Sequence, residues 1–316
     1  MELKISRRNF IKGVAVGLST AIISPLAQFV QAQDCPKILV FGPDGLDFRS
    51  LEDLISKGMI PNLSQLYPAR LLAFPTNTAT KVGWTELESG LGNAWTRVFS
   101  NENFNSQLQG QWTIYGILRE IYPNCWLSLI HSKRDHTGDQ QTANGRYQPF
   151  YYLRQWALEG GMDRYVSACL VKPSGGIFLE ETRNYLLEHI NAYLTSGKVG
   201  GMIFVHFQAP DPQGHQYGMG SSQWNSSVVR IDEILGEAIN LFQPDIIFVV
   251  SDHGFDGFYK TTHSNAPYGV ILSNLPLKRG GGIRTDFVPT VLDAIGIPVE
   301  DRNPELLGSS ILVHVH

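Results

Sequence analysis

The sequence has few cysteines, and none of them has the spacing that a cysteine-based zinc site requires. Only Cys35, Cys125 and Cys169 occur in 316 residues, and no C-x-x-C pair is present. Zinc sites of the cysteine-cluster type are therefore not expected. In an oxidising compartment, three cysteines would allow one disulfide and leave one thiol.

The chain also lacks any cluster of basic residues beyond its first 32 positions. Residues 33–316 hold 21 basic and 28 acidic side chains, a net charge of −7, because four of the basic residues and one acidic residue lie in residues 1–32. Nucleic-acid binding is therefore not expected, since it needs a basic stripe or patch. There are no internal repeats or low-complexity tracts either, and we expect a single globular domain over residues 33–316.

Residues 1–32 have the pattern of an export signal. Ser6-Arg-Arg-Asn-Phe-Ile-Lys12 matches the twin-arginine motif, an apolar stretch of small residues runs from Gly13 to Val30, and Val30-Gln-Ala32 offers a cleavage site. We expect the twin-arginine translocation machinery to export the protein to the periplasm or the extracellular space, with no stable membrane span after cleavage. The alternative is an uncut N-terminal anchor, for which the apolar stretch is short.

Apolar runs alternate with amphipathic segments through the rest of the chain, which predicts an α/β fold with a mostly parallel sheet. The predicted strands are 37–42, 70–74, 126–130, 201–207, 245–250 and 268–272, and the predicted helices are 51–57, 81–89, 109–121, 178–194, 226–242 and 285–295. His189 lies on an amphipathic helix and is interpreted as a packed core residue. The aromatic-rich segment 131–176 is predicted to be an insertion, either a surface excursion or a substrate cap.

Six carboxylate and imidazole side chains follow the predicted strands. They are Asp44, Asp211, His215, Asp252, His253 and His263. Open α/β sheets bind their ligands at the carboxyl ends of strands, and Asp with His suits Zn²⁺. Six ligands suffice for two divalent ions, which we expect to be Zn²⁺, about 3.5–4 Å apart as in hydrolases of phosphate esters. The expected partner is a small-molecule phosphate ester.

A threonine-rich segment could supply a nucleophile to such a centre. Thr76, Thr78, Thr80 and Thr85 are available, and metal coordination would lower the pKa of a threonine hydroxyl. A helix that begins near Thr80 would also direct its N–H groups at a phosphate. The structural alternative is that a threonine caps this helix.

Taken together, these motifs resemble the alkaline phosphatase superfamily, and most of all its type I phosphodiesterase/nucleotide pyrophosphatase branch. The resemblance spans nearly all of the chain after residue 32, and its metal motifs are specific. It rests on Asp44-Gly with Pro61-Asn-Leu63, on Thr80-Lys-Val-Gly-Trp-Thr-Glu-Leu-Glu-Ser-Gly90, on Asp211-x-x-x-His215, on Asp252-His253-Gly254, and on His263 with Pro267-Tyr-Gly-Val-Ile271. The tail from Thr285 to Pro298 is also similar.

The resemblance implies a three-layer α/β/α fold with a small cap, and it implies residue roles. One ion would be held by Asp44, Asp252, His253 and the nucleophile, and the other by Asp211, His215 and His263. Counting back from Gly90 selects Thr80 as the nucleophile, whereas counting forward from Pro75 selects Thr78. The family places an Asn 21 residues beyond its nucleophile, which fits Thr80 with Asn101. The implied reaction is a two-step hydrolysis through a phosphothreonine.

Other activities remain open at this point. The sequence lacks the Phe-Pro-Asn that nucleotide pyrophosphatases place after the nucleophile, so a nucleotide substrate is not implied. A phosphomonoesterase would need a cationic clamp, for which Lys81, Arg97, Lys133, Arg134 and Lys260 are candidates. A sulfatase is disfavoured, because no cysteine lies in a C/S-x-P-x-R motif. The remaining alternative is a catalytically inactive metal-binding module.

Overall fold

The computed structural model describes residues 34–67, 70–74, 77–132, 166–167, 179–278, 280–299 and 305–313. One sheet organises this part of the chain. Its strands are β1 (Lys37–Asp44), β2 (Arg70–Phe74), β3 (Trp126–His131), β4 (Val166–Ser167), β5 (Gly201–Pro210), β6 (Ile246–Val250), β7 (Gly269–Ser273) and β8 (Gly281–Ile283).

The sheet has eight strands in the order β4-β3-β5-β1-β6-β7-β2-β8. All neighbouring pairs are parallel except those of β7, which runs antiparallel to β6 and β2. The predicted mostly parallel sheet is thereby confirmed. Strands β5, β1 and β6 end at the same edge, because they are parallel neighbours at the centre of the sheet.

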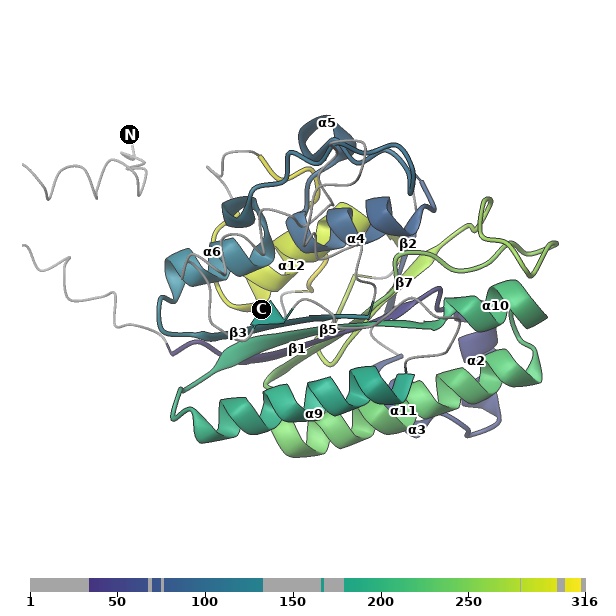
Figure 1. Ribbon diagram of the computed structural model, residues 1–316, viewed down its shortest axis with the longest axis horizontal. Coiled ribbons are helices and arrows are strands. Elements are labelled where there is room, and N and C mark those ends of the chain that lie inside the picture. Colours follow the sequence, from purple (N-terminus) through teal and green to yellow (C-terminus); the bar gives the residue numbers. More distant parts are fainter. Residues whose placement is uncertain are drawn as a thin grey trace, which may run out of the picture.

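Helices cover both faces, which confirms the three-layer α/β/α architecture (Figure 1). One layer holds α4 (Thr80–Ser89), α5 (Asn93–Thr96), α6 (Ile114–Ile121) and α12 (Phe287–Ala294), with the 3-10 turns η2 (Gly110–Trp112) and η3 (Arg284–Asp286). The other holds α2 (Phe48–Ser56), α3 (Pro61–Leu66), α9 (Leu179–Thr195) and α11 (Ser222–Phe242). Helix α10 (Asp211–Tyr217) projects beyond the end of β5.

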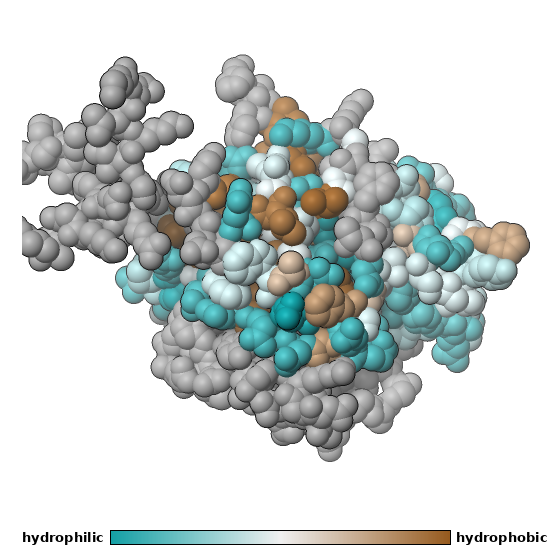
Figure 2. Space-filling view, turned by 90° about the horizontal axis from the view of Figure 1, so that it is seen from above, coloured by the Kyte–Doolittle hydropathy of each residue, from teal (hydrophilic) through white to brown (hydrophobic). Residues whose placement is uncertain are grey.

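The alternation of side chains along the central strands divides the core into two clusters. Met202 and Phe204 of β5 pack with α4, α6 and α12, whereas Ile203 and Val205 pack with α9 and α11. This is the two-residue period of a strand buried on both faces. Seen from above, hydrophobic side chains among the coloured residues form small islands between hydrophilic ones (Figure 2).

Local sequence explains where several helices begin and end. The Asp47 carboxylate caps α2 by accepting from Arg49 N, and Ser221 caps α11 by accepting from Trp224 N. Gly90 ends α4 with a φ of 68°, a left-handed conformation that glycine adopts readily. Helix α4 lies wholly inside the molecule, since all ten of its residues are buried.

Each predicted strand and helix corresponds to an observed element, but the short elements α3, α5, α10, β4 and β8 were not predicted. Residues 1–32 lie outside the described residues, as does the predicted insertion except for residues 131–132 and the two residues of β4. No helix among the described residues is long and apolar enough to cross a lipid bilayer. A disulfide joins Cys35 to Cys125 beside the first residues of β1 and β3.

Candidate metal centre

Three adjacent parallel strands bring three aspartates to one edge of the sheet. Asp44 is the last residue of β1, Asp211 directly follows β5, and Asp252 lies two residues beyond β6. Asp44 pairs in register with Pro210, the residue before Asp211. All three side chains are buried, so the sheet itself assembles the centre.

The first group of potential metal ligands is Asp44, Asp252 and His253, whose ligand atoms lie within 4.8 Å of one another. His253 Nε2 is 3.4 Å from Asp44 Oδ1 and 3.4 Å from Asp252 Oδ2. The Nδ1–H group of His253 donates to Gly254 O at 3.0 Å, which directs the Nε2 lone pair at the two carboxylates. Asp252 Oδ1 accepts from Gly45 N at 3.4 Å, so Oδ2 is the oxygen that faces the group.

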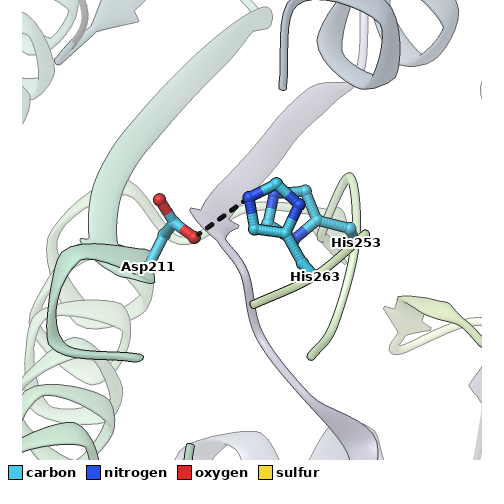
Figure 3. A group of neighbouring side chains, drawn as sticks. All are labelled: Asp211, His253 and His263. Carbon is cyan, nitrogen blue, oxygen red and sulfur yellow. Dashed lines mark ion pairs between the residues drawn. The ribbon is translucent and has the colours of Figure 1, made fainter. Parts of the chain in front are cut away.

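The second group gathers around Asp211. His215 Nε2 lies 3.3 Å from Asp211 Oδ1, and His263 Nε2 lies 3.9 Å from the same oxygen. The Nδ1–H group of His215 donates to Thr261 O at 2.9 Å, again leaving Nε2 toward the carboxylate. Figure 3 shows the Asp211 carboxylate pointing at the imidazoles of His253 and His263.

His253 joins the two groups. Asp211, His253 and His263 have ligand atoms within 4.8 Å of one another, and the rings of His253 and His263 stack at 3.8 Å. The sequence reading placed His253 with Asp44 and Asp252 alone, and the second site with His215. In the structure, His215 lies at the rim, with 46% of its side chain exposed, and approaches Asp211 from outside this triad. The six predicted residues thus form one continuous cluster.

Close contacts between the loops fix this arrangement. Ser251 Oγ accepts from Leu46 N at 2.9 Å and donates to His253 O at 2.8 Å, which ties the end of β1 to the end of β6. Gly45 has a φ of 73°, and a Cβ there would lie 3.0 Å from Asp211 Cβ. Glycine therefore suits this position on both counts, since a larger residue would be strained and would crowd Asp211.

The donor set fits divalent cations. Two ligand atoms about 2.0–2.1 Å from a tetrahedral Zn²⁺ lie about 3.3–3.4 Å apart. The separations of His253 Nε2 from Asp44 and Asp252 and of His215 Nε2 from Asp211 have this length. Three buried carboxylates also repel one another, and bound cations offset that charge. Imidazole nitrogen and carboxylate oxygen are both ligands that Zn²⁺ accepts.

Helix α4, which begins at Thr80, contacts the loop of the first group through Gly83. Thr80 is the first residue of the helix, and Gly83 lies on the same face one turn later. A Cβ on Gly83 would lie 2.5 Å from Asp252 Cβ, so the helix touches the metal-site loop here. The N-cap is Ala79, so the alternative in which a threonine caps this helix is not realised. Thr78 lies two residues before the helix.

Asn101 is held against the same end of α4. Its side-chain Oδ1 accepts from Lys81 N at 3.0 Å, and its backbone oxygen accepts from Lys81 Nζ at 3.0 Å. The ammonium of Lys81 also lies 4.1 Å from the centre of the Phe104 ring. Because the carbonyl end of the Asn101 amide is bound to the helix, its NH₂ end is the donor that can face a substrate.

Two groups of buried polar residues next to the centre were not predicted from the sequence. Arg284 donates to Asp252 O at 2.9 Å and forms an ion pair with Glu86 at 2.6 Å. His206 Nε2 lies 3.4 Å from Asp44 Oδ2. The only signal in the sequence was that His206 interrupts an apolar strand. That His206 lies next to Asp44 follows only from the pairing of β5 with β1.

Comparison with known proteins gives a match to one family model. Residues 38–268 match the model of type I phosphodiesterase/nucleotide pyrophosphatase. The matched range contains all six predicted ligands as well as Thr80 and Asn101.

Solved structures with low sequence identity share the fold. A 2-O GAG sulfatase is 12% identical with a TM-score of 0.57, covering 88% of this chain and 73% of that chain. An alkaline phosphatase superfamily protein from Vibrio parahaemolyticus is 16% identical with a TM-score of 0.56, covering 90% and 71%. Murine ectonucleotide pyrophosphatase/phosphodiesterase 5 is 12% identical with a TM-score of 0.54, covering 88% and 100%.

Proposed function

Since the chain belongs to the type I phosphodiesterase/nucleotide pyrophosphatase family, a family of hydrolases, we propose that it is an exported two-metal phosphodiesterase with a threonine nucleophile. The observation that supports this most is the contact of α4 with the metal-site loop. Thr80 and Gly83 share one helix face, and Gly83 touches Asp252. We infer from this shared face that the hydroxyl of Thr80 lies toward the carboxylates that would hold an ion.

The ligand roles follow the two groups of side chains. Asp44, Asp252 and His253, together with Thr80 Oγ1, would hold one Zn²⁺, and Asp211, His215 and His263 would hold the other. When bound, two such ions lower the pKa of a coordinated hydroxyl and stabilise charge on the leaving oxygen. The Nδ1–H groups of His253 and His215 each donate to a backbone oxygen, and these hydrogen bonds orient both rings for metal binding through Nε2.

The reaction then proceeds in two displacements at phosphorus. Thr80 Oγ1 gives its proton to solvent and attacks phosphorus in line. The P–O bond to the leaving group breaks, the departing alkoxide takes a proton from solvent to become the alcohol, and a phosphothreonine ester results. Water attacks the same phosphorus, the bond to Thr80 Oγ1 breaks, and the hydroxyl regains a proton. The Asn101 NH₂ donates to a phosphoryl oxygen in both transition states, supported by its two contacts with Lys81.

The family match supports a diester over a monoester, and the contacts described for the candidate cations do not involve the metal ligands. A monoester dianion needs a positively charged clamp. Among the described candidates, the Lys81 ammonium supports the Asn101 loop, and Arg97 and Lys260 lie on the exposed surface. Lys133 and Arg134 lie outside the described residues. A diester carries one charge less and needs no such clamp.

Export is supported by the twin-arginine pattern and by the disulfide. The Cys35–Cys125 bond closes a separation of 90 residues, and disulfides of this kind persist in oxidising compartments. We therefore propose that the mature enzyme resides in the periplasm or the extracellular space. Sequencing the N-terminus of the protein recovered from the periplasm tests this, with cleavage after Ala32 as the expected result.

The central experiment compares threonine variants on matched chromogenic substrates. With a bis-nitrophenyl phosphate diester, Thr80→Ala should abolish turnover and keep a near-normal zinc content, because six other ligands remain. Thr78→Ala is the matched control and should retain activity. The corresponding phosphate monoester and sulfate ester should turn over more slowly than the diester in the wild-type enzyme.

Three outcomes would contradict the proposal in different ways. An active Thr80→Ala with an inactive Thr78→Ala would move the nucleophile by two residues. Faster turnover of the monoester would make the enzyme a phosphomonoesterase. Fewer than two ions per chain, with no esterase activity on any of the three substrates, would identify an inactive metal-binding module.

A further inference from the structure

His206 lies on the opposite side of Asp44 from the metal ligands. It belongs to β5, pairs in register with Gly42 of β1 and His131 of β3, and is fully buried. Its side chain lies on the same sheet face as those of Met202 and Phe204, because side chains alternate along a strand. Trp84 of α4 packs edge-on against the His206 ring with centroids 4.5 Å apart.

Each carboxylate oxygen of Asp44 lies near a histidine nitrogen. Its Oδ1 faces His253 Nε2 at 3.4 Å, whereas its Oδ2 faces His206 Nε2 at 3.4 Å. The other ring nitrogen of His206 is 3.1 Å from Ser132 Oγ. When the Ser132 hydroxyl donates to Nδ1, the proton of the neutral ring sits on Nε2, which lies 3.4 Å from Asp44 Oδ2 without hydrogen-bond geometry.

His206 is not itself part of a ligand group. Among the described residues, Asp44, Asp252 and His253 form a set whose ligand atoms all lie within 4.8 Å of one another, and His206 does not belong to it. Its 3.4 Å approach is to Asp44 Oδ2, whereas His253 approaches Oδ1. The geometry is that of a residue that orients a ligand rather than one that binds the ion.

A second layer of buried polar contacts fixes the His206 ring in turn. The His131 ring stacks on it with centroids 4.9 Å apart, and His131 Nε2 pairs with Glu88 Oε1 at 2.7 Å. The Tyr115 hydroxyl donates to Glu88 Oε2 at 2.8 Å. Burial and the Glu88 charge raise the pKa of Tyr115 well above its usual value, so its hydroxyl stays a donor.

We propose that His206 is a positioning residue that holds Asp44 Oδ2, so that Oδ1 is directed at the first metal site. This inference rests on the proposed metal centre. Partners of metal-ligating carboxylates typically contribute about 10–100-fold to metal affinity. His206 should therefore influence the ion on Asp44 strongly and the ion on Asp211 little.

Measurements of zinc affinity test this inference, by chelator competition on the folded mature enzyme. In His206→Ala, one of the two Zn²⁺ ions should bind about 10–100-fold more weakly and the other should bind as in wild type. His206→Gln should recover most of the lost affinity, because the glutamine NH₂ can take the place of Nε2–H. Ser132→Ala, a small change outside direct contact with Asp44, should produce a loss of the same sign.

The control separates metal positioning from simple loss of packing. Val205→Ala truncates the residue that precedes His206 in β5, whose side chain packs on the other face of the sheet. It should lower the melting temperature of the metal-free protein while both zinc affinities stay unchanged. Wild-type affinity for both ions in folded His206→Ala, His206→Gln and Ser132→Ala would overturn the role of His206 and leave the metal centre intact. Failure of the wild-type protein to bind two ions would overturn both proposals.

Discussion

The two faces of the central sheet differ in what they bury. The face covered by α9 and α11 is almost entirely apolar, and its buried Asp232 accepts from Asn62 N and Leu63 N at the start of α3. The face covered by α4, α6 and α12 buries an apolar core of similar extent and a set of polar side chains besides: Glu86, Glu88, His131, His206 and Arg284. Polar burial on the first face serves local structure, whereas on the second it leads to Asp44 and Asp252.

This contrast indicates that one face carries the structure and the other carries the chemistry. Burying charged groups is unfavourable unless each has a partner, so a polar network persists only where its contacts are complete. The α9 and α11 face buries fewer polar groups, among them Asp232 and His189, and is otherwise filled with aliphatic and aromatic side chains. Substitutions of similar size should therefore have different consequences on the two faces.

Removal of the Arg284 charge should have the largest effect. Arg284→Met leaves Glu86 buried without its cation and removes the donor to Asp252 O. Breaking a buried pair in this way typically costs about 3–5 kcal/mol of unfolding free energy. Denaturant unfolding should show this loss, and kcat should fall as well because Asp252 loses its support.

The matched control for Arg284→Met lies on the apolar face. Leu235→Ala in α11 should destabilise the fold by about 2–5 kcal/mol through cavity formation. The folded fraction of that variant should keep wild-type kcat. Adding Glu86→Gln to Arg284→Met should recover part of the lost stability, since no uncompensated charge then remains. Equal losses of kcat in the two single variants would contradict the division between the faces.

A pair of glycine substitutions sharpens the comparison further. Gly83→Ala places a Cβ 2.5 Å from Asp252 Cβ, so α4 and the metal-site loop must move apart. Displacements of about 1 Å near reacting groups can reduce rates about 100-fold, and we expect a loss of that size in kcat/KM for the diester.

Gly236→Ala is the corresponding change in α11. Its Cβ would lie 2.6 Å from Asn62 Nδ2, so this variant also strains a helix contact, but on the apolar face. It should lower the melting temperature and leave kcat/KM close to the wild-type value. If Gly83→Ala kept full activity with both ions bound, Thr80 could not depend on this contact for its position.

Much of the fold followed from sequence because its signals are local. Apolar runs of strand length and amphipathic helical patterns identified all the long elements, and the ends of those strands identified Asp44, Asp211 and Asp252. Short helices such as α3 and α10 were missed because a single turn or two carries no clear periodicity.

The polar network could not be predicted for a different reason. His206, Glu88 and Arg284 lie far apart in the chain, and each looks unremarkable beside its sequence neighbours. Their relation depends on the strand order β3-β5-β1-β6, which places His131, His206 and Asp44 on neighbouring strands. Strand order is a tertiary property, and hydrophobic periodicity alone does not contain it.

The smallest effect that we predict is a pH dependence of the unfolding free energy that arises from the apolar face. His189 of α9 is buried and contacts Ser128 Oγ, and burial lowers its pKa from 6.5 to about 4. A histidine with a lowered pKa in the folded state stabilises the fold above its unfolded pKa and loses that contribution as the pH falls from 6.5 toward 4. Between about pH 7 and about pH 5, the wild-type protein should lose about 2 kcal/mol more unfolding free energy than His189→Gln.

The pH dependence of kcat for the diester should be the same in both proteins, because His189 lies on the face away from Asp44. A shift of that kinetic profile in His189→Gln would show that the apolar face also communicates with the metal centre.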